Sequence, residues 1–318
     1  MSNYIVSVSP HITHKDSTQT IMRDVLIALC PAVIASIILF GFRALLLTLV
    51  CVVSAVFWEW AFEKLCKRKN TIGDLSAAVT GVILAMNLPV TLPLWQAAFG
   101  TFVAIVIVKQ LFGGIGYNFA NLAITARVVM LIAFAGPMTT WVAPNFQIAA
   151  DVVSNASVDA ASGATPLALL NPNSTVSLID LFLGTVGGSM GETSALALLI
   201  GFVYLLCRKV ISWHTPVAFI GTVFVLALIK GGFTYGLAQI LAGGVFLGAI
   251  FMATDYVTTP QTAWGRIIFG VGCGLITCLI RFFGNYPEGV SFSILLMNIL
   301  TPYISAWTAK KPLGGVDA

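Results

Sequence analysis

Apolar runs recur along almost the whole chain of 318 residues, and only short polar stretches separate most of them. About ten of these runs have the composition of helices that cross a membrane. Several are shorter than the roughly 20 residues that a full crossing needs, which is typical of broken or tilted helices inside a bundle. The runs are centred on Val25–Phe42, Ala44–Leu65, Leu75–Leu88, Leu94–Phe112, Ala120–Ala135, Thr193–Cys207, Val217–Ile229, Leu237–Ala253, Ile267–Ile280 and Val290–Trp307. A weaker apolar piece at Leu178–Val186 predicts a short surface or re-entrant helix.

The composition supports an all-α integral membrane protein. Hydrophobic residues make up 58% of the chain and charged residues only 9%, and the mean hydropathy is +0.97. Soluble domains carry about 25% charged residues, so the sequence excludes a globular enzyme with a membrane tail. We expect one polytopic domain over residues 1–318, surrounded by a lipid bilayer and with no nucleic-acid partner. The first 20 residues are polar, so we predict no cleavable signal peptide.

The basic residues predict the orientation of the bundle. With the N-terminus in the cytoplasm, most of the 16 Lys and Arg residues lie in cytoplasmic loops, as positive-inside orientation requires. Only Arg43, Lys230 and Arg281 then lie outside, and Arg127 lies within a span. Ten spans place both termini in the cytoplasm and the long polar connection of residues 136–177 on the extracytoplasmic side.

The two halves of the chain share a faint pattern. Span three ends in Ala-Met-Asn-Leu-Pro and span eight ends in Phe-Met-Ala-Thr-Asp, while Gly116-Tyr-Asn-Phe and Gly289-Val-Ser-Phe open spans five and ten. Because each half holds an odd number of spans, the halves would be inverted relative to each other. We therefore predict inverted repeats over residues 1–135 and 178–318, with a site near their interface.

Polar residues inside apolar spans are costly and mark candidate sites. Asn118 and Asn121 are three residues apart, so a helix would place both amides on one face, where they could hold one ligand. Amides that bond between helices are the alternative. Asp255, at the end of span eight, is a candidate cation or proton site, or an interfacial cap. Glu192 begins span six near the polar connection, and its alternative role is capping.

The polar connection contains Asp159-Ala-Ala-Ser-Gly-Ala-Thr-Pro. A polar loop of this length is uncommon in a compact chain and is usually functional or disordered. The stretch resembles the recognition sequence at which a flavin transferase joins FMN to a threonine hydroxyl through a phosphoester. Thr165 supplies the hydroxyl, and the small residues Ser162, Gly163 and Ala164 allow a bulky flavin phosphate to approach the backbone.

Cysteine and histidine predict no metal centre. The six Cys residues do not form the tight spacing of an iron–sulfur site, and the three His residues lack the spacing of metal ligands. No Gly-x-Gly-x-x-Gly follows a strand, so no nicotinamide site is expected.

Over nearly its whole length the chain resembles the RnfD subunits of the Rnf complex and their relatives, the NqrB subunits of the sodium-pumping NADH:quinone oxidoreductase. One departure is that Leu122 follows Asn121, where the family usually has Pro. The matching stretches are Gly116-Tyr-Asn with Asn121 and Arg127, Asp159 to Pro166, Gly187-Gly-Ser-Met-Gly-Glu-Thr-Ser-Ala-Leu-Ala, and Phe251-Met-Ala-Thr-Asp-Tyr-Val-Thr-Thr-Pro.

The resemblance implies a fold similar to urea-transporter-type inverted repeats in a bacterial cytoplasmic (inner) membrane. It implies a subunit that relays electrons during ferredoxin:NAD⁺ oxidoreduction coupled to Na⁺ or H⁺ translocation, and that is not active alone. Thr165 would carry covalent FMN in a threonyl phosphoester linkage. Asn118 and Asn121 match the place of a second, non-covalent flavin, riboflavin, with Arg127 and Glu192 as further cofactor-binding residues. The implied partners are RnfA, RnfB, RnfC, RnfE, RnfG and, for maturation, a flavin transferase.

Two other functions remain open from the sequence. One is an NqrB-type subunit with quinone as the acceptor. The other is a secondary transporter or channel with no redox role, which explains the spans, the repeats and the buried Asn and Asp residues but not the stretch from Asp159 to Thr165.

Overall fold

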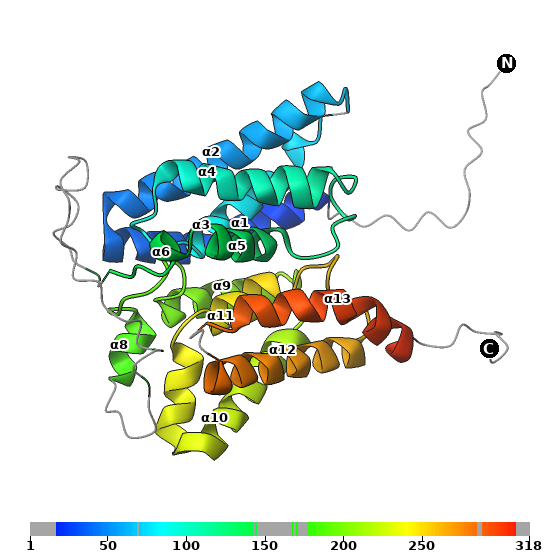
Figure 1. The fold of residues 1–318 in the computed structure, drawn as a ribbon. Coiled ribbons are helices and arrows are strands. Elements are labelled where there is room, and N and C mark those ends of the chain that lie inside the picture. The colour runs from blue at the N-terminus through cyan, green and yellow to red at the C-terminus, as the bar shows by residue number, and fades with distance from the viewer. Residues whose placement is uncertain are drawn as a thin grey trace, which may run out of the picture.

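The computed structural model describes residues 17–68, 70–142, 144, 167, 170, 177–284 and 288–309. Within these residues every regular element is a helix (Figure 1). In chain order the elements are α1 (Thr18–Phe40), α2 (Phe42–Leu65), η1 (Ile72–Asp74), α3 (Ser76–Met86), α4 (Leu94–Phe102), η2 (Val103–Gln110), α5 (Leu122–Ala133), α6 (Ala135–Met138), α8 (Leu178–Leu183), α9 (Ala195–Cys207), α10 (His214–Leu241), α11 (Val245–Leu247), η3 (Gly248–Met252), α12 (Ala263–Phe283) and α13 (Val290–Thr308).

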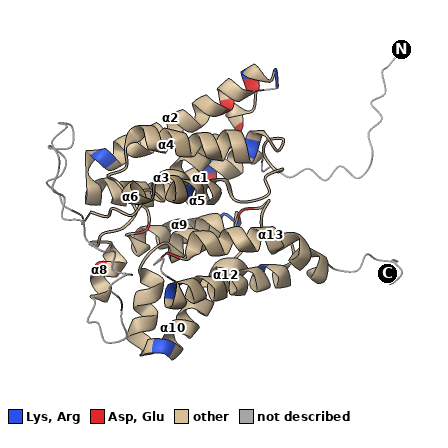
Figure 2. Cartoon of the chain, in the orientation of Figure 1, with Lys and Arg blue, Asp and Glu red and all other residues tan. Residues whose placement is uncertain are grey.

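The helices have the lengths and compositions of a membrane protein, as predicted. In the described part of the chain, α1, α2, α10, α12 and α13 are long and apolar enough to cross a membrane. Four of the shorter predicted spans match apolar helices, namely α3, the continuous α4–η2 helix, α5 and α9. Charged residues are sparse along all of these helices (Figure 2).

Predicted spans seven and eight are not separated by a loop. Element α10 covers span seven and the start of span eight, and it consists of two helices that meet between the predicted spans at Gly232, whose backbone is left-handed at φ 83°. Only glycine adopts such a φ at little cost, and a sharp bend within a helix needs an identifiable cause of this kind. The rest of span eight follows as α11 and η3 after a second left-handed glycine, Gly243 at φ 72°. Span eight is therefore a broken helix.

The chain forms two groups of helices that lie against each other. Figure 1 shows α1 to α6 in one group and α9 to α13 in the other, with α8 at one end and the last turn of α13 at the other end. The two groups meet where α1 packs on α9 and α5 packs on α13. Gly201 of α9 allows the closest approach, because a Cβ there would lie 2.3 Å from the carbonyl oxygen of Ala28. Small residues at helix contacts are the usual means of close packing in membranes.

The predicted short helix near residue 178 is present as α8. The Ser177 side chain accepts a hydrogen bond from the backbone N–H of Asp180 at its start, and Gly184 ends it in the left-handed conformation at φ 96°. Both are ordinary helix-terminating devices.

Candidate functional site

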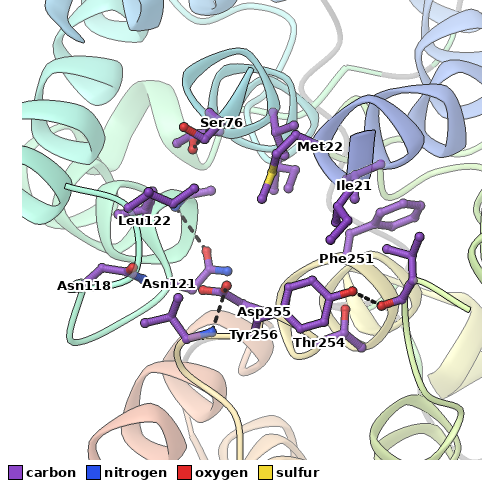
Figure 3. Close-up of a pocket in the computed structure, with 18 of the residues that line it drawn as sticks. Ile21, Met22, Ser76, Asn118, Asn121, Leu122, Phe251, Thr254, Asp255 and Tyr256 are labelled. Atoms are coloured by element: carbon purple, nitrogen blue, oxygen red, sulfur yellow. Dashed lines mark hydrogen bonds between the residues drawn. The ribbon is translucent and has the colours of Figure 1, made fainter. Parts of the chain in front are cut away.

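A cavity of about 320 Å³ lies between the two groups of helices. Its walls come from the start of α1, from α3, from residues 115–123 and from residues 250–257. Figure 3 shows polar side chains from different elements around it, with Asn118, Asn121 and Asp255 on one side and Ser76 across from them. Most of the lining is apolar, with few polar groups.

Asn121 holds the start of α5 in place against this cavity. Its Oδ1 accepts hydrogen bonds from the backbone N–H groups of Ala123 and Ile124, at 3.1 and 3.2 Å. Its Nδ2 donates to the carbonyl oxygen of Met252 in η3, at 3.3 Å. Asn121 is thus the N-cap of α5 and also ties α5 to the other half of the chain.

The prediction that Asn118 and Asn121 share one helix face is wrong. The helix α5 begins only at Leu122, so Asn118 lies in the preceding non-helical segment, where its Nδ2 donates to the carbonyl oxygen of Ala120 at 3.0 Å. Gly113, Gly114 and Gly116, which precede Asn118, adopt positive φ. Tertiary folding nevertheless brings both amide side chains to the wall of the same cavity.

Asp255 also lines this cavity, in the turn that follows η3. Its carboxylate accepts from the hydroxyl of Thr258 at 3.2 Å and from the backbone N–H of Val257 at 3.4 Å. Burial raises the pKa of Asp255, and hydrogen bonds from Val257, Thr258 and Asn118 oppose that rise. Asp255 is half-buried at the cavity wall, and a carboxyl inside a membrane bundle marks a candidate ion-binding residue.

Lys109 lies inside the bundle, although the pattern of basic residues along the sequence groups it with the cytoplasmic loop charges. The structure buries Lys109 on η2, where its Nζ lies 2.5 Å from Glu59 Oε1 and 2.6 Å from Ser76 Oγ. Glu59 is completely buried. A carboxylate in the middle of an apolar span, such as that of Glu59, requires a buried cationic partner. This requirement could have indicated from the sequence that a basic residue such as Lys109 is buried. Lys109 and Ser76 form part of the cavity wall.

Arg127 and Glu192 do not contact this cavity. Arg127 NH1 donates to Glu192 Oε1 at 2.6 Å and to Asn87 Oδ1 at 2.8 Å, and NH2 donates to Glu288. This network of Arg127, Glu192, Glu288 and Asn87 joins α3, α5, the turn before α9 and the start of α13. Arg127 is six residues beyond Asn121, a rise of about 9 Å along α5. The predicted site residues therefore divide between two places.

A capping role for Glu192 is also ruled out in the structure, because the Ser194 side chain caps α9. The turn that carries Glu192 is fixed instead by its backbone. Met190 N–H donates to the carbonyl oxygen of Leu88 at 3.2 Å, and Gly191 N–H donates to that of Met86 at 2.8 Å. Glu192 is thereby held against the end of α3 and faces Arg127.

The predicted flavinylation residues Asp159, Ser162, Gly163, Ala164 and Thr165 lie outside the described residues. Leu167 is described, and it is 7% exposed. It lines a second, small cavity of about 20 Å³ together with Glu192, Glu288 and Gly243.

Arg281 of α12 approaches the same place. Its NH1 donates to the carbonyl oxygen of Gln239 at 2.6 Å, and its NH2 donates to that of Ala242 at 3.3 Å. A Cβ on Gly243 would lie 3.0 Å from Arg281 NH2 and 3.2 Å from a methyl carbon of Leu167. A guanidinium group therefore lies near Leu167.

A largely apolar cavity with a few polar groups, together with buried ion networks between apolar helices, defines a membrane protein that binds a ligand or handles charge inside its helical bundle. A sequence profile of the NQR2, RnfD, RnfE family matches residues 5–314. The chain therefore belongs to this family.

Curated relatives agree over nearly the full length. The chain is 46% identical to the D subunit of the Na(+)-translocating ferredoxin:NAD(+) oxidoreductase complex of Acetobacterium woodii, over 98% of this chain and 96% of the relative. It is 40% identical to the D subunit of the proton-translocating ferredoxin:NAD(+) oxidoreductase complex of Clostridium ljungdahlii, with the same coverage. It is 35% identical to the D subunit of the ion-translocating oxidoreductase complex of Escherichia coli O9:H4, over 97% of this chain and 98% of the relative.

Proposed function

We propose that this chain is the D subunit of an ion-translocating ferredoxin:NAD⁺ oxidoreductase complex in a bacterial cytoplasmic membrane. In this proposal it relays electrons through FMN joined to Thr165 and through a second flavin, riboflavin, held without a covalent bond. It works with the other Rnf subunits rather than alone. Near full-length similarity to two such D subunits, at 46% and 40% identity, supports the assignment.

The observation that supports a second, non-covalent flavin is the cavity between the two helix groups. Its volume of about 320 Å³ lies in the range of roughly 300–1,000 Å³ that is usual for small-molecule sites. Its apolar walls suit a flat ring system, and Asn118 and Asp255 are placed to hydrogen-bond the polar edge of such a ring. Asn121 would act indirectly, because its amide already caps α5 and bonds η3.

The surroundings of Leu167 support a flavin on Thr165. A threonyl phosphoester of FMN carries a negative charge, and the Arg281 guanidinium beside Leu167 can balance it. When bound, the two flavins supply electron acceptance and donation. The chain's own residues position them and compensate charge, which is the physical basis for coupling to a translocated cation.

We also propose that the two helix groups are inverted repeats of a urea-transporter-like fold, with the termini in the cytoplasm and the Thr165 connection outside. The contacts of α1 with α9 and of α5 with α13 support this, since they pair corresponding helices of the two halves. One relative is named for Na⁺ translocation and another for proton translocation. Either ion therefore fits the proposal for this chain. An NqrB-type subunit remains the alternative redox function.

The flavin on Thr165 is tested with the full chain, co-expressed with its partner subunits and an active flavin transferase. The denatured protein is separated on a gel and illuminated. We expect a fluorescent band that disappears in Thr165→Val and is partly retained in Thr165→Ser, where a hydroxyl survives. Thr175→Val, in the same connection, is the matched control and should keep the band.

A dark band in the parent protein would overturn the covalent flavin and favour a transporter or channel without a redox role. A band that survives in Thr165→Val would place the linkage on another residue. The non-covalent flavin is measured separately, as the flavin that acid precipitation releases into the supernatant.

A further inference from the structure

A buried carboxylate, Glu192, and a partly buried one, Glu288, share a single guanidinium in the Arg127 network. Arg127 NH1 contacts Glu192 Oε1 at 2.6 Å and its NH2 contacts Glu288 Oε2. The side chains of Arg127 and Glu192 are 6% and 2% exposed, and that of Glu288 is 18% exposed. If both carboxyls were ionised, the group would carry one uncompensated negative charge away from water, which is costly.

Arg281 offsets this imbalance only in part, because its charge lowers the pKa of Glu288 less than burial raises it. Arg281 faces the pair from α12, but Arg281 donates its hydrogen bonds to Gln239 and Ala242, and among the described residues no ion pair joins it to either carboxylate. Tyr235 of α10 and Cys278 of α12 lie near Arg281, and both are neutral at ordinary pH. Asn87 of α3 contributes only an amide.

One oxygen of the pair has no partner. Glu192 is 4% exposed, and its Oε2 is buried without a hydrogen-bond partner in the part of the chain that the structure describes. Both Glu192 and Glu288 line the small cavity beside Leu167. A buried carboxylate oxygen left without a donor is costly, so the position calls for a ligand that donates to it.

A proton fits this position better than a metal ion. The cavity of about 20 Å³ holds about one water molecule. The Arg127 charge, bonded to both carboxyls, repels a second cation. A proton between two carboxyl groups needs no additional space and brings the pair and Arg127 to zero net charge.

We propose that Glu192 and Glu288 form a proton-binding carboxyl pair in which one proton is shared between the two side chains and exchanges with water through the cavity beside Leu167. The raised pKa of Glu288 agrees with a shared proton. Burial raises the pKa of Glu288 to about 8, the charge of Arg127 opposes that rise, and the charge and hydrogen bonding of Glu192 add to it. The pair exists whether or not Thr165 carries a flavin, whereas its relevance to electron transfer rests on the proposed function.

The experiment is infrared spectroscopy of the full chain, purified with its partner subunits, with isotopically labelled glutamate to identify glutamate bands. At neutral pH we expect a protonated-carboxyl band of about one glutamate that disappears in Glu192→Gln and also in Glu288→Gln. Each variant removes one of the two carboxyl groups that share the proton. Asp180→Asn, an exposed acid on α8 at the same end of the bundle, is the control and should keep the band.

Three results would overturn the proposal: no such band in the parent, a band that only one of the two variants removes, or a band that appears only when Na⁺ is replaced by a large organic cation. The last result would mean that Na⁺ normally occupies the pair. Measurements on the parent at several pH values and Na⁺ concentrations need no variant, so poor folding of a variant does not block the test. Repeating the spectrum on Thr165→Val separates the two hypotheses, because the band should persist without covalent flavin.

Discussion

Arg127 in α5 donates a 2.6 Å hydrogen bond to Glu192, a residue 65 positions further along the chain. The same guanidinium reaches Asn87 and Glu288, so one side chain joins both helix groups. Its position near Leu167 separates it from the large cavity at the start of α5. The bundle therefore contains two polar centres, one in the large cavity and one at the Arg127 network.

Removing the guanidinium should destabilise the protein strongly. Arg127→Gln leaves both carboxyls without their cation, and breaking a buried ion pair in this way costs about 3–5 kcal/mol. The measurement is the free energy of unfolding in mixed micelles. Arg23→Gln, at an exposed position on α1, is the control and should change stability by about 0.5 kcal/mol or less. A loss below about 1 kcal/mol in Arg127→Gln would contradict a central role for the network.

Stability should fall as pH rises through the Glu288 titration. The folded-state pKa of about 8 lies above the ordinary value of 4.5, so the folded protein binds the proton more tightly than the unfolded chain does. The contribution of Glu288 is complete below pH 4.5 and is lost as pH approaches and passes about 8. We expect the unfolding temperature to decrease across this window.

Glu288→Gln should flatten that decrease, because the amide does not titrate. Some slope should remain in the variant, since burial raises the pKa of Asp255 as well. An unfolding temperature that rises between pH 4.5 and 8 in the parent, or that keeps its full slope in the variant, would argue against a raised Glu288 pKa.

A Cβ added at Gly201, where α1 packs on α9, should destabilise the protein. The added carbon would lie 2.3 Å from the carbonyl oxygen of Ala28 and 2.9 Å from the ring of Phe251. Overpacking of this kind costs about 1–3 kcal/mol, which the unfolding temperature of Gly201→Ala would report. Gly221→Ala in α10 is the matched control, because no heavy atom lies within 4 Å of its Cβ, and it should be neutral or stabilising by up to about 1 kcal/mol.

Filling the large cavity should remove the non-covalent flavin and leave the covalent one. Val79 of α3 lines the cavity, and Val79→Phe should lower the retained extractable flavin at least about tenfold, which corresponds to about 1.4 kcal/mol of binding free energy. Val53→Phe is the matched control, since Val53 is 58% exposed on α2. Equal flavin contents in the two variants would place the second flavin elsewhere.

Much of the fold could be predicted from the pattern of apolar runs. The helix at Leu178–Leu183 and the long helices α1, α2, α12 and α13 appear where the sequence predicts them, because a membrane requires long apolar stretches with internally satisfied backbones. The separation of spans seven and eight is also predicted and falls at Gly232, but the sharp kink that forms it could not be predicted in this way. Hydropathy reports the length of an apolar run and carries no information about a single backbone angle.

The candidate site could be predicted only in part. Asn118, Asn121 and Asp255 stand out as polar residues among apolar ones, and they line one cavity. The sequence does not separate them from Arg127 and Glu192, because spacing along a chain does not fix distance across a bundle. Glu288 receives no role from the sequence, since a lone acid before a span resembles an ordinary polar loop residue.

The sequence by itself determined that this is a helical membrane protein, which polar residues are costly inside it, and which threonine is the candidate for a flavin. The first two properties follow from transfer free energies, and the third follows from the resemblance of the stretch from Asp159 to Thr165 to a flavinylation sequence. The tertiary structure decided which of these residues meet: Lys109 with Glu59, Arg127 with Glu192 and Glu288, and Asn121 with η3. Ion pairs and cavities form between helices far apart in the chain, so their existence depends on how the helices pack.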